Sequence, residues 1–354
     1  MRYDYSQITK NLLSWYRENA RVLPWRSNPE PYYVWISEIM LQQTRVEAVK
    51  EYFNRFIKEL PDIETLARVE DDKLLKLWEG LGYYNRARNL KKAAIVVMEE
   101  FGGRLPADYD KLLTLPGIGS YTAGAISSIA YGIPVPAVDG NVLRVTKRLS
   151  AGYEDITRDS VKKEIFAELL EDMPKEEAGA FNQALMELGA VVCIPNGRPL
   201  CNSCPVAEYC LACKQEVAME LPVKPAKKGR KIEEKTILVL EYQGKYALHK
   251  RGEKGLLAGL WEFPGLEGRV GLDRIEKLLE EHRIEEYTME LLGEAKHIFS
   301  HVEWHMLGYG IRIGKKCPEF ENQELFSELV WADREQLLGE YALPSAFRVY
   351  KEKL

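Results

Sequence analysis

Residues 115–121 read Leu-Pro-Gly-Ile-Gly-Ser-Tyr and form a tight turn between two predicted helices, at 110–115 and 120–131. Gly117 and Gly119 let the backbone turn sharply and leave N–H groups exposed where the second helix begins. Because these groups lie at the positive end of the helix dipole, they can hold one phosphate without reading base sequence. The same glycines would also suit a plain helix-turn-helix corner, so the motif alone leaves both interpretations open.

The chain on both sides of this turn is predicted to be helical. Apolar residues recur at helical spacing from Trp35 to Leu60 and predict one helix that stops at Pro61. Further helices are expected at 63–68, 72–81, 85–101, 140–150, 159–171 and 176–192. Residues 217–234 contain several Lys and Pro residues and predict a linker. The sequence therefore predicts an all-α domain over residues 1–216.

Residues 235–354 have a mixed pattern that predicts a second, smaller α/β domain. Residues 236–242 and 245–250 read as two strands of a hairpin that turns at Gln243-Gly244. Strands are also expected at 296–313 and 328–332, and one helix near 271–282. The fold class is therefore multidomain.

The composition is that of an ordinary globular protein, with 46% hydrophobic and 29% charged residues in a chain of 354. The net charge of −5 comes from residues 236–354, which carry 16 basic and 21 acidic residues, whereas the first 235 residues carry 33 of each. DNA binding needs a local basic patch and not a basic chain, so charge neither supports nor excludes it. No apolar run reaches membrane-spanning length and the N-terminus lacks a signal-peptide pattern. We expect a cytoplasmic monomer with no membrane partner.

Apart from the turn, two acidic residues stand out in the sequence. Glu38 lies in Ser37-Glu38-Ile39-Met40-Leu41-Gln42-Gln43-Thr44, and Asp139 lies in Val138-Asp139-Gly140-Asn141-Val142. Taken singly, Glu38 reads as a solvated residue near a helix start, and Asp139 as the cap of a helix that begins at Gly140. A capping carboxylate is already oriented, so Asp139 can both cap the helix and act in catalysis.

Five of the six cysteines fall between Cys193 and Cys213, which in a reducing compartment indicates a metal site. Cys193, Cys201, Cys204 and Cys210 have the spacing C-x7-C-x2-C-x5-C. A tetrahedral zinc site on Cys201, Cys204, Cys210 and Cys213 is one possibility, although its central loop is short for a zinc ribbon.

In this order, the three motifs and the cysteines resemble the helix-hairpin-helix DNA glycosylase superfamily, and within it the MutY family of adenine DNA glycosylases. The resemblance covers nearly the whole chain. It implies a repair enzyme that hydrolyses the N-glycosidic bond of adenine mispaired with 8-oxoguanine or guanine in double-stranded DNA. A related glycosylase for another mispaired or oxidised base remains the alternative. A DNA-binding or electron-transfer module without catalysis is disfavoured, because simple binding needs neither Glu38 nor Asp139.

The resemblance assigns four catalytic positions. Glu38 would protonate the flipped adenine at N7, Asp139 would stabilise the oxocarbenium character of the sugar, and Asn141 would support Asp139. Protonation at neutral pH requires the pKa of Glu38 to be raised by about 2 units. Tyr121 stands where bifunctional relatives carry a lysine, so no Schiff base can form there and base removal without lysine-dependent strand cleavage is expected.

The resemblance also implies three groups of DNA contacts. The residues expected around the flipped adenine are Arg21, Trp25, Arg26 and Gln183, with Glu187 nearby. Those expected at the vacated stack or against the opposite base are Gln43, Thr44, Leu81 and Tyr83. The backbone at Gly117 and Gly119 is expected to hold a DNA phosphate.

The second domain resembles a Nudix domain from Gly255 to Gly265, but residues 272–281 lack the R-E-x-x-E-E pattern that binds magnesium. The resemblance therefore implies recognition of 8-oxoguanine by Phe299, Ser300 and His301, not nucleotide hydrolysis. A metal site on His297, His301 and His305 is rejected, because residues four apart on one strand are about 13 Å apart.

For the cysteines, the resemblance implies one four-iron, four-sulfur cluster on Cys193, Cys201, Cys204 and Cys210. The first gap is one residue longer than is usual in the family. The turn-forming pair Asn196-Gly197 lies in that gap and can absorb the extra residue.

Overall fold

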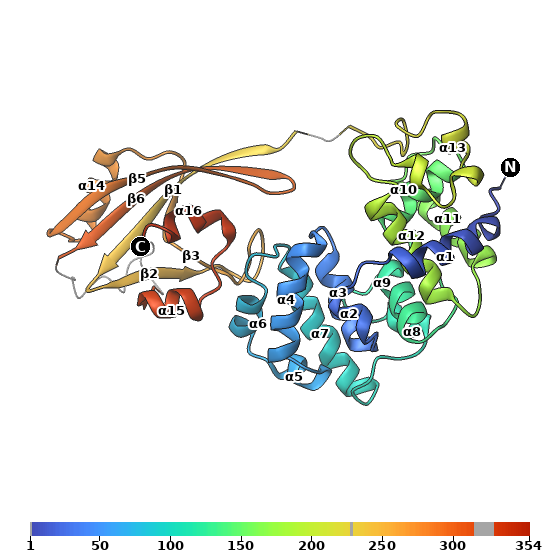
Figure 1. Cartoon of the computed structure of the whole chain (residues 1–354). Coiled ribbons are helices and arrows are strands. Elements are labelled where there is room, and N and C mark those ends of the chain that lie inside the picture. The colour runs from blue at the N-terminus through green and yellow to red at the C-terminus, as the bar shows by residue number, and fades with distance from the viewer. Residues whose placement is uncertain (1, 227–228, 315–328) are drawn as a thin grey trace. The chain divides into compact units, whose positions relative to one another are not determined.

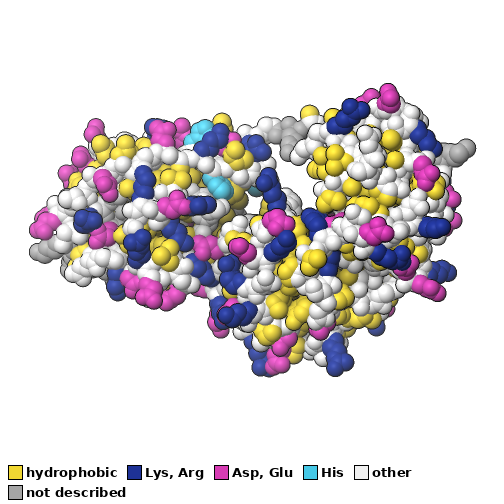
Figure 2. Space-filling model, in the orientation of Figure 1, with side chains coloured by type: hydrophobic (Ala, Val, Ile, Leu, Met, Phe, Trp, Pro, Cys, Tyr) yellow, Lys and Arg dark blue, Asp and Glu magenta, His cyan; other side chains and the backbone are white. Residues whose placement is uncertain are grey.

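The computed structural model describes residues 2–226, 229–314 and 329–354, which divide into two compact units (Figure 1). The first unit consists of Met1–Val69 and Arg88–Ala226, and the second of Glu70–Ala87 and Lys227–Leu354. The sequence prediction had placed residues 70–87 in the first domain, whereas the structure groups them with the second unit. On the face drawn in Figure 2, basic and acidic side chains are interspersed.

The first unit is built from helices, as predicted. Its α-helices are α1 (Thr9–Asn19), α2 (Pro24–Ser27), α3 (Pro31–Leu41), α4 (Val46–Glu59), α5 (Ile63–Arg68), most of α7 (Asn85–Glu100), α8 (Tyr109–Leu113), α9 (Ser120–Ala125), α10 (Gly140–Leu149), α11 (Asp159–Asp172), α12 (Ala178–Val191) and α13 (Leu211–Lys214). Short helical turns lie at Tyr5–Ile8, Cys201–Ser203 and Ala207–Tyr209.

Helices α1, α10, α11 and α12 share one apolar core. Leu12, Val145, Phe181 and Leu188 are among its fully or almost fully buried members. Helices α10 and α12 approach closely at Gly189, where an added Cβ would lie 2.6 Å from the Cβ of Asn141. This close approach fixes the start of α10, which carries Asp139 at its N-cap.

The prediction of one helix from Trp35 to Leu60 is wrong. Helix α3 ends at Leu41 and α4 begins at Val46, and between them Gln43 adopts a left-handed backbone with φ of 60°. The apolar spacing on either side of the break continues in phase, and neither Gly nor Pro marks it. The break matters for the site, because it turns Gln43 and Thr44 toward the cavity described below.

The turn at 115–121 joins α8 to α9 as predicted. Gly117 has φ of +76°, and a Cβ there would lie 2.6 Å from the Cβ of Asn89, so both conformation and space require glycine. Gly119 is the N-cap of α9 and makes no side-chain capping bond. The predicted helix 120–131 changes character at Ile126, since Ile126–Ala130 forms a π-helical turn.

The second unit contains a sheet with the strand order β3-β2-β1-β6-β5; β4 pairs with β1, and β7 with β2. The strands are β1 (Lys231–Tyr242), β2 (Lys245–Lys250), β3 (Trp261–Glu262), β4 (Gly265–Glu267), β5 (Tyr287–Ile298), β6 (Val302–Ile313) and β7 (Val330–Ala332). The hairpin at Gln243-Gly244 is confirmed. Strands β1 and β6 are parallel, and β5 and β6 are antiparallel. The single strand predicted at 296–313 is therefore wrong, because residues 299–301 turn between two strands.

Both faces of this sheet are covered, which gives the α/β architecture. Ile237 and Val239 of β1 pack against residues of α15 (Arg334–Gly339) and α16 (Arg348–Lys351), with the turn Ser345–Phe347 between them. Leu238 and Leu240 point the other way, toward α14 (Leu272–Glu281). The alternation along β1 thus buries every side chain of its central stretch.

Helix α6 (Asp71–Leu77) belongs to this second unit through polar contacts. Lys76 Nζ donates to the carbonyl oxygen of Tyr341 at 2.9 Å, and Asp72 pairs with Lys250 at 2.7 Å. Glu79, just beyond the helix, pairs with Lys351 at 3.0 Å. These partners lie far away in sequence, so no local pattern indicated the association.

Candidate active site

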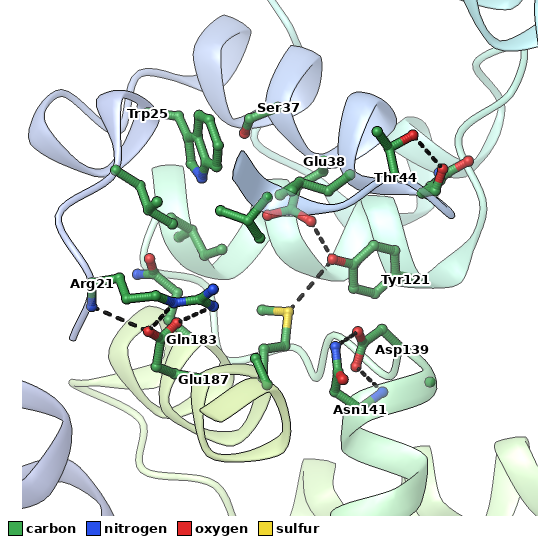
Figure 3. Close-up of a pocket in the computed structure, with 18 of the residues that line it drawn as sticks. Arg21, Trp25, Ser37, Glu38, Thr44, Tyr121, Asp139, Asn141, Gln183 and Glu187 are labelled. Atoms are coloured by element: carbon green, nitrogen blue, oxygen red, sulfur yellow. Dashed lines mark hydrogen bonds and ion pairs between the residues drawn. The ribbon is translucent and has the colours of Figure 1, made fainter. Parts of the chain in front are cut away.

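A cavity of about 620 Å³ opens within the first unit, a volume typical of sites for small ligands (Figure 3). Eleven of the residues singled out from the sequence line it: Arg21, Trp25, Arg26, Glu38, Gln43, Thr44, Tyr121, Asp139, Asn141, Gln183 and Glu187. The structure thus brings together side chains from the 21–26 segment, α3, the α3–α4 break, α9, α10 and α12.

Glu38 lies on the last turns of α3 and is only 6% exposed. Burial raises the pKa of Glu38 to about 7, and the negative charge of Asp139 adds to this. The hydroxyl of Tyr121 and the charge of Arg26 act in the opposite direction, because both stabilise the carboxylate. Glu38 is therefore able to exchange a proton near neutral pH, which a general acid requires.

Tyr121, on the first turn of α9, points its hydroxyl at the carboxyl group of Glu38 (Figure 3). Its hydroxyl donates to Oε2 of Glu38 and also lies 3.5 Å from Sδ of Met186. Burial, together with the carboxylates of Glu38 and Asp139, raises the pKa of Tyr121 well above its usual value. Tyr121 is thus a neutral donor that orients the carboxyl group of Glu38.

Asp139 is the N-cap of α10, and its carboxylate accepts three hydrogen bonds. Oδ1 accepts from the backbone N–H groups of Asn141 and Val142 at 2.9 and 2.8 Å, and Oδ2 accepts from Nδ2 of Asn141 at 2.7 Å. Burial raises the pKa of Asp139, while these three bonds and the charge of Arg144 lower it. The effect of burial is the larger one, so the capping hydrogen bonds limit the rise in the pKa of Asp139 without cancelling it.

Arg144 contacts Asn141 and was not identified from the sequence. Its Nη2 donates to Oδ1 of Asn141 at 2.9 Å and to the carbonyl oxygen of Gly189 at 2.7 Å, and its Nε donates to the carbonyl oxygen of Cys193 at 2.8 Å. Two side chains therefore connect Asp139 to the first cysteine. The position of Arg144, three residues after Asn141 on one helix, is the sequence signal that could have found it.

The buried Glu187 of α12 forms a charge cluster with two half-buried arginines. Its Oε1 accepts from Nε of Arg21 at 2.6 Å, and its Oε2 from Nη2 of both Arg21 and Arg26 at 3.0 and 2.8 Å. Burial would raise the pKa of Glu187, but the two guanidinium groups outweigh it and leave the pKa below its usual value. The cluster stiffens the cavity wall formed by residues 21–26.

The remaining predicted wall residues differ in how firmly they are held. Trp25 is buried and packs edge-on against Phe53, with ring centroids 5.4 Å apart. Gln183 is half-buried and makes one long contact, 3.4 Å from Nε2 to the carbonyl oxygen of Gly179. Gln43 is exposed at the rim. Ser37, Gly140, Met186 and Lys224 also line the cavity and were not singled out as site residues.

Leu81 and Tyr83 lie in the second unit, on the segment after α6, and do not line the cavity. Tyr83 is 47% exposed with φ of 48°, whereas Leu81 is only 6% exposed. Arg86 donates through Nη2 to the carbonyl oxygens of Leu81 and Gly82, both at 3.0 Å. The loop therefore presents Tyr83 outward and keeps Leu81 covered.

Phe299, Ser300 and His301 form the tip of the β5–β6 hairpin. Phe299 packs inward, with its ring 4.9 Å from that of Trp304 and 4.6 Å from that of His297. Ser300 and His301 are exposed. The hairpin pairs His297 with Trp304 and Lys296 with His305, so His297 and His305 lie on opposite faces of neighbouring strands. The expectation of one continuous strand through His297, His301 and His305 is wrong, because residues 299–301 turn between β5 and β6.

Five cysteines surround one small apolar cavity, namely Cys193, Cys201, Cys204, Cys210 and Cys213. Burial raises the pKa of Cys204 to about 12 and of Cys210 to about 11, and the neighbouring sulfurs contribute. Thiolates at this density need the positive charge of a bound metal. Among the described residues, no three His, Cys, Asp or Glu side chains converge on a position for a single ion. Five thiols around one cavity are the kind of donors that a sulfur-ligated metal group requires.

Comparison with known proteins agrees with this architecture. Residues 36–171 match the HhH-GPD superfamily of base excision DNA repair proteins, and residues 236–353 match the NUDIX domain family. The chain is similar to a thermostable thymine-DNA glycosylase (28% identity, TM-score 0.53, 59% of this chain and 96% of that one) and to endonuclease III trapped on DNA (29%, TM-score 0.51, 59% and 97%). The predicted combination of an all-α glycosylase fold with a Nudix-like domain is confirmed.

Similarity over the whole chain is to adenine DNA glycosylases. The chain is 33% identical to that of Rattus norvegicus over 99% of this chain and 79% of the relative, and 35% identical to that of Homo sapiens over 89% and 69%. The relative from Buchnera aphidicola subsp. Schizaphis graminum is 34% identical, with 86% of each chain covered. Among the described residues, no helix is long and apolar enough to span a bilayer. The chain belongs to the adenine DNA glycosylase family of base excision repair enzymes, hydrolases that act on N-glycosyl bonds.

Proposed function

We propose that the enzyme releases adenine from mispairs with 8-oxoguanine or guanine in double-stranded DNA, with Glu38 as the general acid and Asp139 as the stabiliser of the sugar cation. The observation that carries this proposal is that one cavity contains two carboxyl groups, the buried Glu38, whose pKa is raised to about 7, and the half-buried Asp139. Adenine is a poor leaving group as an anion, so a proton must reach the base as the glycosidic bond breaks.

The two carboxyl groups are suited to different roles by their partners. Among the described residues, Glu38 accepts a hydrogen bond from Tyr121, and its pKa of about 7 allows it to exchange a proton near neutral pH. Asp139 accepts three N–H groups, which favour its ionised form, and an oxocarbenium ion developing beside it would favour that form further. Asn141 holds Asp139 in position and is in turn held by Arg144.

We propose that the flipped adenine occupies the space between Trp25, Gln183 and the Arg21–Arg26–Glu187 cluster. Both arginines form ion pairs with Glu187 and so serve as part of the cavity wall. The side-chain amide of Gln183 can still hydrogen-bond to the edge of a base. Base flipping is required because the glycosidic bond is inaccessible to buried carboxyl groups while the base is stacked.

The reaction should end at base removal. Tyr121 carries no amine, and its hydroxyl is bound to Glu38, so it cannot attack the sugar to form a Schiff base. A related glycosylase for another base is the second candidate, favoured by the likeness of the fold to a thymine-DNA glycosylase. The similarity to adenine DNA glycosylases over both domains favours adenine.

Recognition of the opposite base is proposed for the exposed members of two loops. Ser300 and His301 present a hydroxyl and an imidazole at the β5–β6 tip, while Phe299 anchors that tip on Trp304. Tyr83 is exposed on the 81–83 loop, and Gln43 and Thr44 lie at the rim of the cavity. The covered position of Leu81 means that any contact with the stack needs the loop to move. Gly117 and Gly119 are proposed to hold a DNA phosphate.

For the cysteines we propose one four-iron, four-sulfur cluster held by Cys193, Cys201, Cys204 and Cys210. Such a cluster would order the loop from 193 to 213 through four Fe–S bonds. Arg148 supports the same loop, since its Nη1 lies 3.2 Å from Sγ of Cys193 and it donates to the carbonyl oxygen of Ile194 at 3.0 Å. A broad absorbance band in the blue region would be expected for the cluster, and a colourless protein with stoichiometric zinc would contradict it.

The test of the proposed function is a cleavage assay on duplexes with adenine opposite 8-oxoguanine, guanine or thymine, using the wild type and Glu38→Gln. The wild type is expected to release adenine from the first two duplexes and to spare the third. Glu38→Gln should bind the duplexes and release no adenine, because an amide cannot supply the proton. Substantial release by Glu38→Gln would refute the assignment, whereas release of thymine would favour the second candidate.

A further inference from the structure

The cations that line the cavity differ in whether they already have hydrogen-bond or ion-pair partners. Among the residues that the structure describes, four cations line it: Arg21, Arg26, Arg144 and Lys224. Arg21 and Arg26 are bound to Glu187, and Arg144 is bound to Asn141 and to two backbone carbonyl groups. Within the described part of the chain, Lys224 makes no hydrogen bond or ion pair with an acidic side chain. Lys224 is therefore the cation whose three N–H donors remain available to a ligand.

Lys224 is exposed, but the backbone that leads to it is fastened to the first unit. The carbonyl oxygen of Leu221 accepts from Nε of buried Arg148 at 2.9 Å, and Leu221 itself is buried. The carbonyl oxygen of Val223 accepts from the N–H of Ile156 at 3.3 Å. Lys224 therefore stands at the mouth of the cavity on an anchored segment, not on a free tether.

The other anion-binding feature nearby is already in use. The first N–H groups of α10 would suit a phosphate, but the carboxylate of Asp139 accepts from two of them. A flipped nucleotide brings a phosphodiester on each side of its sugar, and both must lie at the mouth while the base is inside. Adenine itself has no anionic group, and a hydrated ammonium point charge matches a phosphate oxygen.

We infer that Lys224 binds the DNA phosphodiester next to the flipped nucleotide, as an additional substrate-binding residue supplied by the connector between the two domains. This inference rests on the proposed function, since it needs a nucleotide turned into the cavity. A contact to phosphate carries no sequence information, so it should strengthen binding equally whichever base lies opposite.

The test measures how binding depends on salt. The probe is a fluorescent duplex that carries a tetrahydrofuran abasic analogue opposite 8-oxoguanine or guanine, titrated with the full-length protein from 50 to 200 mM NaCl. Each phosphate that the protein neutralises contributes about 0.9 to the slope of log K against log salt. Lys224→Gln should therefore lower the slope by about 1, and across this fourfold range its affinity should fall about 3.5-fold less than that of the wild type. The loss should be the same opposite either base.

Two further variants make the result specific. Lys224→Arg keeps the charge and should restore most of the slope. Lys163→Gln removes an exposed lysine of α11 that does not line the cavity and should leave the slope unchanged. An unchanged slope in Lys224→Gln, or an equal decrease in Lys163→Gln, would overturn the inference. Borohydride cross-linking of Lys224 to an abasic product would also overturn it, since the amine would then face the sugar and not the phosphate.

Failure of the proposed function would look different. In that case the wild type would not release adenine from its mispairs or would not prefer the abasic probe over an unmodified duplex. Failure of the inference alone would leave both properties intact in the wild type and would leave the slope of Lys224→Gln unaltered.

Discussion

Tyr121→Phe is expected to move the pH range in which the enzyme releases adenine. The hydroxyl of Tyr121 donates to Oε2 of Glu38 and so stabilises the ionised form of that carboxyl group. Without the hydroxyl, burial and the charge of Asp139 still act, and the pKa of Glu38 rises above its present value of about 7. Because the reaction needs protonated Glu38, the variant should keep its acid form at higher pH.

The size of this shift follows from the kind of bond that is lost. A hydrogen bond to a charged group contributes about 1.5–3 kcal/mol, and one pKa unit corresponds to about 1.4 kcal/mol, so the pKa of Glu38 should rise by about 1–2 units. At pH 8 a group with a pKa of 7 is about one tenth protonated, and a group with a pKa of 8.5 about three quarters. The alkaline fall of the normalised rate should therefore move upward by a similar amount.

The assay is single-turnover release of adenine from a duplex with 8-oxoguanine opposite, measured from pH 5.5 to 9.5 and normalised to each variant's own maximum. Tyr32→Phe is the matched control, because its buried hydroxyl donates to the carbonyl oxygen of Leu60 at 2.8 Å and does not line the cavity. An alkaline limb of Tyr121→Phe that stays in place, or that moves to lower pH, would refute the role given to this hydrogen bond.

Three further substitutions test the site through stability. Glu38→Gln should stabilise the fold by about 3 kcal/mol at pH 8 and by only about 1 kcal/mol at pH 5, because the buried carboxylate of the wild type becomes costly as pH rises from about 4.5 through 7. Urea unfolding that shows equal effects at both pH values would contradict this. Glu187→Gln should cost about 3 kcal/mol in the same assay, since it leaves two half-buried guanidinium groups without their shared carboxylate, and an unchanged midpoint would exclude it. Gly189→Ala should cost about 1–3 kcal/mol and slow adenine release by displacing Asn141, whereas Gly252→Ala, with nothing within 4 Å, should do neither.

Residues that contact their partners through local backbone geometry could be predicted from the sequence. Asp139 caps α10 because it directly precedes the helix, and Asn141 reaches back to it two residues later. The turn at Gly117 could be predicted because only glycine tolerates a φ of +76° so close to Asn89. These features depend on neighbours in sequence, which a motif records.

Features set by tertiary packing were missed or misread. The left-handed Gln43 interrupts a continuous apolar pattern, and the turn at 299–301 contains neither Gly nor Pro. In both cases the packing of the flanking elements imposes the break. The hydrophobic periodicity continues across it and therefore predicts one uninterrupted element. Lys224 was passed over for a related reason, since only the hydrogen bonds of Leu221 and Val223 bring a linker residue to the mouth of the cavity.

The polar contacts of α6 have a consequence for how the protein would come apart. A protease that cuts the connector near residue 227 leaves Asp72, Lys76 and Glu79 on the amino-terminal fragment, while their partners Lys250, Tyr341 and Lys351 leave with the other. The helical fragment would then carry the 81–83 loop on a segment stripped of three tertiary contacts. Cleavage near residue 227 should therefore yield an amino-terminal fragment in which residues 70–87 unfold first. Tyr83 should lose its fixed orientation before the carboxyl groups of the cavity lose theirs.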